Sequence, residues 1–352
     1  MVERHDVLIV GSGPAGLSTA IFLREYGNDP DILLLERLHG DRLSRYRRIC
    51  GEGISARAFK ALEPIKPEEV KHRISRMEID WPGNVRIKQR ANGYILDRPA
   101  FLSRLSEDYE DMGGSFSRGS VVSVEREEAG YLARLADGSE VRSRFIVGAD
   151  GAFSIVRKSL FKTHPLKKFA VEQYLVDSEA DPETLIFRMG QRYQGGYRWE
   201  FPCGGLVNTG FPLGTDSLDR YEERNVRYLP FGGVGPVSDG RALLVGDAAG
   251  QANPLTFGGI RVALHAGKAA AKSIISGRPE SYGSWWRSSL LSSPWYMKSH
   301  LTLASWTDED MRSAAAPFQE GARVWPFVHR ALTSPQDLHM YVAYTLAFRD
   351  SW

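Results

Sequence analysis

Three glycines near the start of the chain have the spacing of a phosphate-binding turn. They form a Gly-x-Gly-x-x-Gly motif between an apolar run over 6–11 and a helical pattern over 14–26. The first permits a tight turn, the second lets a pyrophosphate approach the backbone, and the third lets helix and strand pack closely. An acidic residue ends the next apolar run, where it accepts hydrogen bonds from ribose hydroxyls. We therefore predict a dinucleotide site whose contacts here are Gly11, Ser12, Gly13, Pro14, Ala15, Gly16, Glu36 and Arg37.

Two aspartates follow later apolar runs. Asp150 lies in GADG at 148–151, and Asp247 lies in GDAAG at 246–250. Each stands where the chain leaves a parallel strand, at the edge where α/β sheets bind ligands. Asp247 suits the ribityl chain of a flavin, and a helix opening at Gly258-Gly259 directs its positive end toward the pyrimidine edge. The alternative for each aspartate is an N-cap of a helix.

The order of these motifs resembles the flavoprotein group that includes p-hydroxybenzoate hydroxylase, over about residues 6–275. The resemblance implies FAD as the cofactor, bound also by Gly246, Asp247, Gly258, Gly259 and Ile260. It further implies that Arg98, in LDRPAF, contacts the flavin. Val121 is expected to meet the adenine through its backbone, although several valines compete for that role.

Two more segments are similar to the geranylgeranyl reductase branch of this group. They are Cys50-Gly51-Glu52-Gly53 and the YxWxFP signature at Tyr197–Pro202. The similarity implies hydride transfer from reduced flavin to C=C bonds of an isoprenoid chain, carried by a lipid or a diphosphate. One departure is Phe257, where many relatives have glycine, and its ring would narrow the space beside the isoalloxazine. The chain is also shorter than many members, which bears on the length of any lipid tunnel.

The YRWEFP strand alternates with period 2, which places Tyr197, Trp199 and Phe201 on one face. With Phe257, this face is the predicted substrate wall; the alternative is an ordinary core face. Cys50, Glu52 and Tyr197 are the candidates for supplying a proton, and the CGEG loop, Cys50 and Gly51 included, is also expected beside the cofactor. Cys50 has the alternative of a small buried residue, and a redox pair with Cys203 stays open.

Other functions fit the same motifs. An aromatic hydroxylase using O₂ shares the fold and both aspartate motifs, and a flavin that passes electrons to a partner is a third alternative. The CGEG loop favours the reductase. The electron donor stays open between NADPH, ferredoxin and a deazaflavin, because no second Gly-x-Gly-x-x-Gly is present.

Composition limits the class of protein. The 352 residues carry a net charge of +2, which gives no electrostatic case for nucleic acid as a partner. Two cysteines exclude a disulfide framework and indicate a reducing compartment. No secretory signal and no apolar run of membrane-spanning length is found, and no metal site is predicted. We expect a cytoplasmic protein, with peripheral membrane contact left open.

These motifs require an α/β fold with a doubly wound, Rossmann-type FAD domain. We expect that domain to comprise 1–70, 97–165 and 225–285, with an antiparallel substrate sheet from 71–96 and 166–224. Residues 38–53 are expected to form a long loop, and 286–352 a helical C-terminal region. From residue 285 onward the chain holds six of the eight tryptophans, which either pack this tail onto the FAD domain or meet a membrane interface.

Overall fold

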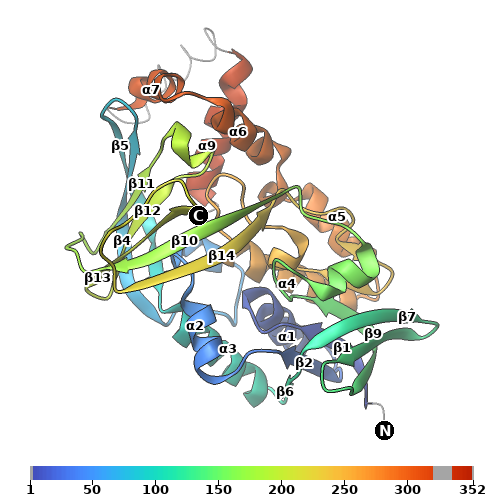
Figure 1. The fold of residues 1–352 in the computed structure, drawn as a ribbon. Helices are drawn as coiled ribbons and strands as arrows, with labels where there is room; N and C mark the ends of the chain where they lie inside the picture. The colour runs from blue at the N-terminus through green and yellow to red at the C-terminus, as the bar shows by residue number, and fades with distance from the viewer. Residues whose placement is uncertain (1–2, 320–334, 351–352) are drawn as a thin grey trace.

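The computed structural model describes residues 3–319 and 335–350 and contains two eight-stranded sheets with helices packed around them (Figure 1). The first sheet has the order β15-β16-β9-β1-β2-β6, and β7 and β8 extend it from β9. Its strands are β1 (Glu3–Val10), β2 (Ile32–Glu36), β6 (Ser115–Arg118), β7 (Val121–Glu127), β8 (Gly130–Leu135), β9 (Glu140–Gly148), β15 (Ser238–Asp239) and β16 (Ala242–Leu244).

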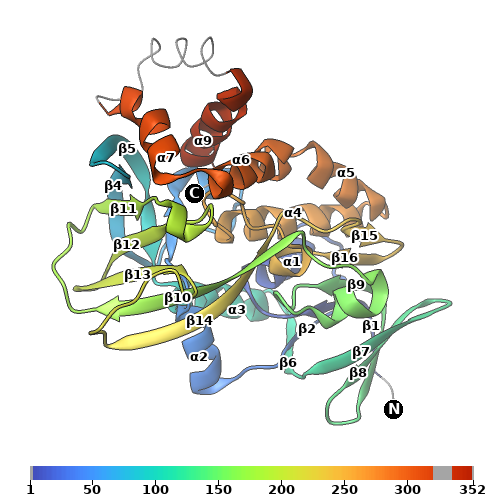
Figure 2. The ribbon, with the colours of Figure 1, turned by 45° about the horizontal axis from the view of Figure 1, so that its top comes forward.

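The central strands of the first sheet are parallel and covered by helices. β1 pairs in parallel with β2 and β9, because the crossover helix α1 (Pro14–Tyr26) returns the chain to the same end of the sheet. α1 packs against α3 (Arg98–Asp111) and α4 (Ile260–Ile275), and Figure 2 shows α4 lying along α1. The apolar runs of β1 and β2 are accordingly buried in the larger core. The predicted doubly wound FAD domain is confirmed.

The second sheet is antiparallel except for one parallel pair, β4 with β11. Its order is β14-β10-β13-β12-β11-β4-β5-β3. The long hairpin at one end is the one expected over 72–96, turning at Pro82–Asn84. The strands of the second sheet are β3 (Gly53–Ser55), β4 (Val70–Trp81), β5 (Val85–Leu96), β10 (Lys167–Val176), β11 (Thr184–Arg188), β12 (Arg198–Cys203), β13 (Leu206–Pro212) and β14 (Glu223–Phe231).

The C-terminal helices divide between the two cores. α5 (Glu280–Ser288) places Trp285 and Trp286 against the first, while α6 (Pro294–Ser305), α7 (Asp308–Ala315) and α9 (Leu338–Asp350) lie over the second sheet (Figures 1 and 2). Trp306 packs there too, and Trp295 is exposed. Trp325 and Trp352 lie outside the described residues. Within the described parts of the chain, no helix combines the length and apolarity needed to cross a bilayer.

Two details differ from the sequence-based expectations. The expected loop over 38–53 contains a helix, α2 (Gly40–Arg48), which lacks a broad apolar stripe and so gave no helical signal. Asp41 in its first turn and arginines in its last turn suit the helix dipole. The second sheet also runs past the expected boundary at 224 to the end of β14, and it includes β3.

Candidate cofactor and substrate site

The carboxyl ends of four parallel strands are in register. Val10 of β1 pairs with Leu35 of β2 and with Gly148 of β9, and Gly148 pairs in turn with Leu244 of β16. The chain therefore leaves the sheet at one edge after each of these strands. The glycine turn and the acidic residues predicted to bind the cofactor follow those four points, so the fold brings them together.

A cavity of about 620 Å³ opens at this edge, with walls from both sheets. Two of the predicted site residues, Ser12 and Gly16, do not line the cavity. Both belong to the glycine turn and are buried. The predicted residues on its wall are Gly11, Gly13, Pro14, Ala15, Glu36, Arg37, Cys50, Gly51, Glu52, Arg98, Val121, Asp150, Tyr197, Trp199, Phe201, Gly246, Asp247, Phe257, Gly258, Gly259 and Ile260.

The glycine turn is closed on one side and open on the other. A Cβ on Gly16 would lie 1.9 Å from the carbonyl oxygen of Gly11, so only glycine lets helix and strand approach this closely. A Cβ on Gly13 would meet no atom within 4 Å, although Gly13 lines the cavity. The turn thus leaves an open backbone surface at the start of α1, where free N–H groups bind phosphates.

Glu36 is fixed at the end of β2. One of its carboxylate oxygens accepts hydrogen bonds from the backbone N (2.9 Å) and Oγ (2.8 Å) of Ser12, and the other accepts from the N of Leu38 (2.9 Å). These bonds hold the carboxylate at the cavity wall. The ribose contact that we predicted for Glu36 remains a prediction.

Among the residues that the structure describes, Asp150 forms hydrogen bonds through only one of its carboxylate oxygens. Oδ2 accepts hydrogen bonds from the N–H groups of Ile155 (2.6 Å) and Val156 (3.2 Å), which corresponds to the capping alternative. Oδ1 is buried and has no hydrogen-bond partner among the described residues. Burial raises the pKa of this carboxyl. One oxygen therefore orders the turn that follows β9, and a ligand contact of Asp150 remains a prediction.

Asp247 pairs with an arginine that no motif indicated. Nη2 of Arg227, on β14, lies 3.3 Å from Oδ2 of Asp247, and Nη1 donates to the carbonyl of Ile49 at 3.1 Å. The guanidinium also lies over the Tyr46 ring, 4.9 Å from its centroid. Arg227 lines the cavity and connects the second sheet to the GDAAG motif. β14 gives only a strand pattern, which carried no sign of this contact.

Some side chains on the cavity wall carry buried polar atoms that lack partners among the described residues. Arg98 is 4% exposed and donates from Nη1 to the carbonyl of Arg47 at 2.6 Å, yet its Nε is buried without a partner among the described residues. Burial, together with the charge of Arg227, lowers the pKa of Arg98. Oδ1 of Asp150 and Oε1 of Gln173 are likewise unpartnered there. With the open glycine turn, these atoms fit a long polar ligand such as FAD.

The CGEG loop is tied to the second sheet by two amide side chains. The carbonyl of Cys50 accepts hydrogen bonds from Nδ2 of Asn208 (2.7 Å) and Nε2 of Gln173 (3.1 Å). The Sγ of Cys50 accepts from the N of Glu52 at 3.3 Å. Asn208 and Gln173 lie inside strands that carry no motif, so sequence reasoning missed them.

Glu52 is a buried carboxylate with a cationic partner. It is 2% exposed, its φ is 62°, and Nζ of Lys71 lies 2.7 Å from its Oε2. Its Oε1 accepts from the backbone N of Arg98 at 3.3 Å. Burial raises the pKa of Glu52, and Lys71 opposes that shift. Lys71 also approaches Sγ of Cys203, and Cys203 and Cys50 are both free thiols.

The aromatic wall follows the expected alternation. Tyr197, Trp199 and Phe201 line the cavity, whereas Arg198 and Glu200 form ion pairs on the other face of the sheet. The Oη of Tyr197 donates to the carbonyl of Thr256, and burial raises the pKa of this phenol. Nε1 of Trp199 donates to Oδ1 of Asn208 at 3.0 Å. Asn208 is therefore hydrogen-bonded both to the aromatic wall, at Trp199, and to the CGEG loop, at Cys50.

Phe257 extends the wall from the other side. Its ring stacks on Tyr197 with centroids 5.4 Å apart, and the rings of Phe169, Phe231 and His300 surround it. Its φ of 50° lies in the left-handed region. Burial lowers the pKa of His300 to about 4, so this ring is a neutral packing partner near pH 7. The ring of Phe257 is thus held in place where it narrows the cavity.

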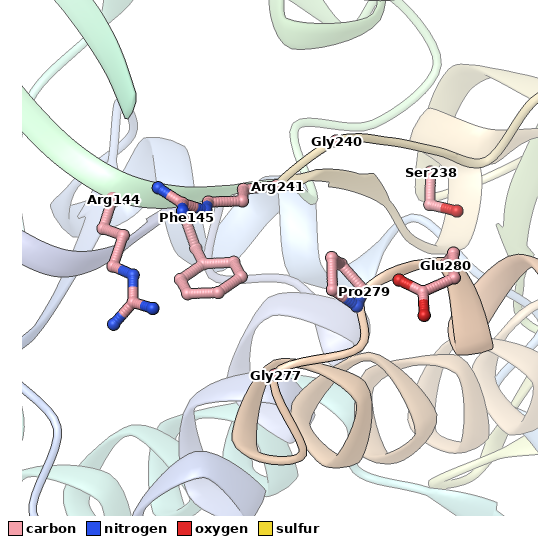
Figure 3. Close-up of a pocket in the computed structure, with 8 residues that line it drawn as sticks. All are labelled: Arg144, Phe145, Ser238, Gly240, Arg241, Gly277, Pro279 and Glu280. Atoms are coloured by element: carbon pink, nitrogen blue, oxygen red, sulfur yellow. The ribbon is translucent and has the colours of Figure 1, made fainter. Parts of the chain in front are cut away.

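A second cavity, of about 340 Å³, lies at the other end of α4 (Figure 3). Its walls include Arg144 and Phe145 on β9, Arg241 before β16, and Gly277 after α4. Because α4 is 16 residues long, this cavity lies about 24 Å from the cofactor edge. It contains none of the predicted site residues.

The chain matches the FAD binding domain family over residues 4–185. Digeranylgeranylglycerophospholipid reductase 2 of Methanothermobacter thermautotrophicus is 34% identical over 314 residues, covering 78% of this chain and 80% of the relative. The chain belongs to the geranylgeranyl reductase family of FAD flavoproteins. The menaquinone reductase of Mycobacterium tuberculosis is 28% identical to the present chain over 320 residues, covering 77% of this chain and 76% of the relative.

Solved structures support the fold of this geranylgeranyl reductase-family flavoprotein. A geranylgeranyl bacteriochlorophyll reductase-like protein from Thermoplasma acidophilum superposes with a TM-score of 0.79 at 21% identity, covering 98% of this chain and 99% of the other. The myxobacterial chondrochloren halogenase, an FAD-dependent enzyme, superposes with a TM-score of 0.60 at 17% identity, covering 80% and 78% of the two chains. The predictions of FAD as cofactor and of the family are confirmed.

Proposed function

We propose that the protein is an FAD-dependent reductase that saturates C=C bonds of a geranylgeranyl chain carried by a lipid. The observation that carries this proposal is a single cavity that joins the cofactor cradle to the aromatic wall. An apolar chain gains about 25 cal/mol per Å² when it is buried against such a wall. Digeranylgeranylglycerophospholipid reductases at 30–34% identity support a lipid substrate.

The chemistry divides between the cofactor and this chain. When bound and reduced, FAD supplies a hydride. The aromatic wall and Phe257 would align the alkene and exclude water, and the protein would supply the proton that the second carbon needs. Tyr197 is poorly suited to that step, since burial raises its pKa and its hydroxyl already donates to Thr256. We therefore assign Tyr197 to substrate contact and propose Glu52 as the proton donor, with Cys50 beside it.

The test is a single anaerobic turnover. Photoreduced protein is mixed with a digeranylgeranyl phospholipid, flavin reoxidation is followed by absorbance, and the lipid is examined by mass spectrometry. We expect a mass gain of two hydrogens per flavin reoxidised. No reoxidation by any prenyl lipid would contradict the proposal. NADPH oxidation coupled to O₂ consumption and product hydroxylation would instead support an aromatic hydroxylase.

We further propose that the protein meets the membrane at the cavity mouth. Phe153 lines the cavity and is 50% exposed, and it packs edge-on against Tyr228, which is 42% exposed. Nζ of Lys168 lies 4.4 Å and 5.2 Å from the two ring centroids. Exposed aromatic rings beside lysine suit an interface with anionic lipids.

Sedimentation with vesicles tests this contact. We expect binding to vesicles that contain anionic phospholipid, and weaker binding after Phe153→Ser. Leu290→Ser is the matched control, because Leu290 is exposed but lies away from this mouth. Equal binding by both variants and the parent protein would contradict the assignment.

For the electron donor, we propose an acidic carrier protein such as a ferredoxin. α2 borders the cavity through Tyr46 and exposes Arg42, Arg45 and Arg48, none of which has an ion-pair partner among the described residues. Such a surface steers an acidic protein, and the rate falls as salt rises. Flavin reduction by reduced ferredoxin should therefore slow with salt and in Arg42→Ser; reduction by NADPH alone at a faster rate would contradict this donor.

A further inference from the structure

A hydride-transfer cavity walled by aromatic rings needs a route by which protons enter. Gly51 and Gly53 pack on the Phe201 ring, since a Cβ on either glycine would lie 3.1 Å or 3.3 Å from it. Glu52, between them, thus places its carboxyl behind the aromatic wall while lining the cavity. Because the group is 2% exposed, bulk water does not reach it directly.

Lys71 connects this carboxyl to solvent. Its Nζ lies 2.7 Å from Oε2 of Glu52, and its side chain is 23% exposed, whereas Lys71 is absent from the cavity wall. Lys71 therefore contacts the Glu52 carboxyl from outside the cavity wall, and part of its side chain is exposed to solvent. Lys71 lies on β4, outside every motif that predicted the site.

We propose that Lys71 is a proton-relay residue that supplies Glu52 with the proton for each reduction, an inference that rests on the proposed function. At rest the pair is a carboxylate and an ammonium. In each turnover the Lys71 ammonium would pass a proton to the Glu52 carboxylate, and the resulting carboxyl would deliver it to one carbon as the C=C π bond breaks. The other carbon would receive the hydride that FAD supplies when bound and reduced, FAD being oxidised by that loss, and water would reprotonate the Lys71 amine.

Charged groups face both members of the pair. Glu52 faces Lys71 and the backbone and charge of Arg98, and Lys71 faces Glu52, Cys203 and Asp97. His72, next along β4, has its pKa lowered by burial and by Lys71. Burial lowers the pKa of Lys71, but the charge and hydrogen bond of Glu52, together with the charges of Cys203 and Asp97, outweigh burial and raise it. Burial also raises the pKa of Glu52, which favours its protonated form.

The test separates a relay from a structural ion pair by replacing Lys71 with arginine. Lys71→Arg keeps the positive charge, but arginine does not release a proton in proteins. With dithionite as electron source and vesicles of digeranylgeranyl phospholipid, we expect Lys71→Arg and Lys71→Met to lose repeated turnover by about 10²-fold, with FAD affinity unchanged. Lys88→Met is the control, because it removes a surface pair with Glu78 on the same hairpin. Wild-type turnover in Lys71→Arg would overturn the proposal.

A second readout does not depend on turnover. Without its cation, the buried Glu52 should become protonated, so Lys71→Met should show an infrared band of a neutral carboxyl at pH 7. The band should be missing from the parent protein and from Lys71→Met combined with Glu52→Gln. If Lys71→Met shows no such band, Lys71 does not control Glu52 and the relay is refuted. A parent protein that shows the expected infrared behaviour but reduces no prenyl lipid would refute the proposed function alone.

Discussion

Replacing Phe257 tests whether its ring limits the cavity at the expense of a strained backbone. Removing a fully buried phenyl ring costs about 3–5 kcal/mol. Phe257 has four aromatic neighbours to lose but is only partly buried, so its removal should cost less than that. Its φ of 50° costs a non-glycine residue about 1–2 kcal/mol. Glycine avoids that strain but loses about 0.4–1 kcal/mol through the entropy of the unfolded chain.

The two effects predict an unusual order of stability. Phe257→Ala keeps the strained φ and should be destabilised by about 2 kcal/mol, whereas Phe257→Gly should be about 0.5–1 kcal/mol more stable than the alanine variant. Urea unfolding of the FAD-loaded proteins measures this difference. If alanine proves more stable than glycine at this position, the backbone of Phe257 is not strained and the reasoning fails.

The same variants test the width of the cavity. Phe257→Gly should raise the reoxidation rate with bulkier prenyl lipids relative to the parent protein, because the wall retreats on the side of Tyr197. Phe169→Ala is the matched control: it removes a ring that packs behind Phe257 but does not line the cavity. Identical substrate ranges for Phe257→Gly and the parent would show that the ring does not limit the substrate.

Three further changes have defined outcomes. Gly16→Ala should give a colourless protein that takes up no FAD, as judged by absorbance, because its Cβ would lie 1.9 Å from the carbonyl oxygen of Gly11. Arg227→Gln should lower the free energy of unfolding by about 2–3 kcal/mol and weaken FAD binding, measured by fluorescence titration, since Asp247 loses its cation. Burial lowers the pKa of His300 in the folded protein to about 4, so the unfolded chain binds the proton first as pH drops. The free energy of unfolding should therefore fall between about pH 6.5 and 4, by about 3 kcal/mol at most. His300→Gln should flatten that part of a urea-midpoint profile against pH; an unchanged profile would exclude His300 as its source.

The parts of the site that follow parallel strands were predictable from the sequence. Glycine spacing and an acidic residue after an apolar run carry a direct physical meaning, so the cradle at Gly11 and the positions of Asp150 and Asp247 were found. The alternation of the YRWEFP strand likewise placed the aromatic wall on one face.

Residues that act through contacts between distant segments of the chain were not predictable. Arg227, Asn208 and Lys71 each lie within a strand of the second sheet, and their function depends on which strand of the chain lies opposite. Strand pairing over long separations is not encoded by local pattern. α2 was missed for a different reason, because its residues are almost all polar and its helix signal lies in charge and capping rather than in periodicity.

The second sheet is assembled from two non-contiguous pieces of chain, β3 to β5 and β10 to β14, with β4 and β11 joined in parallel across the middle. Neither half of the molecule can therefore be excised as one continuous fragment. Anyone wishing to transplant the lipid-facing half onto another flavoprotein would have to move both pieces together. Altered specificity is more readily obtained by point changes on existing strands.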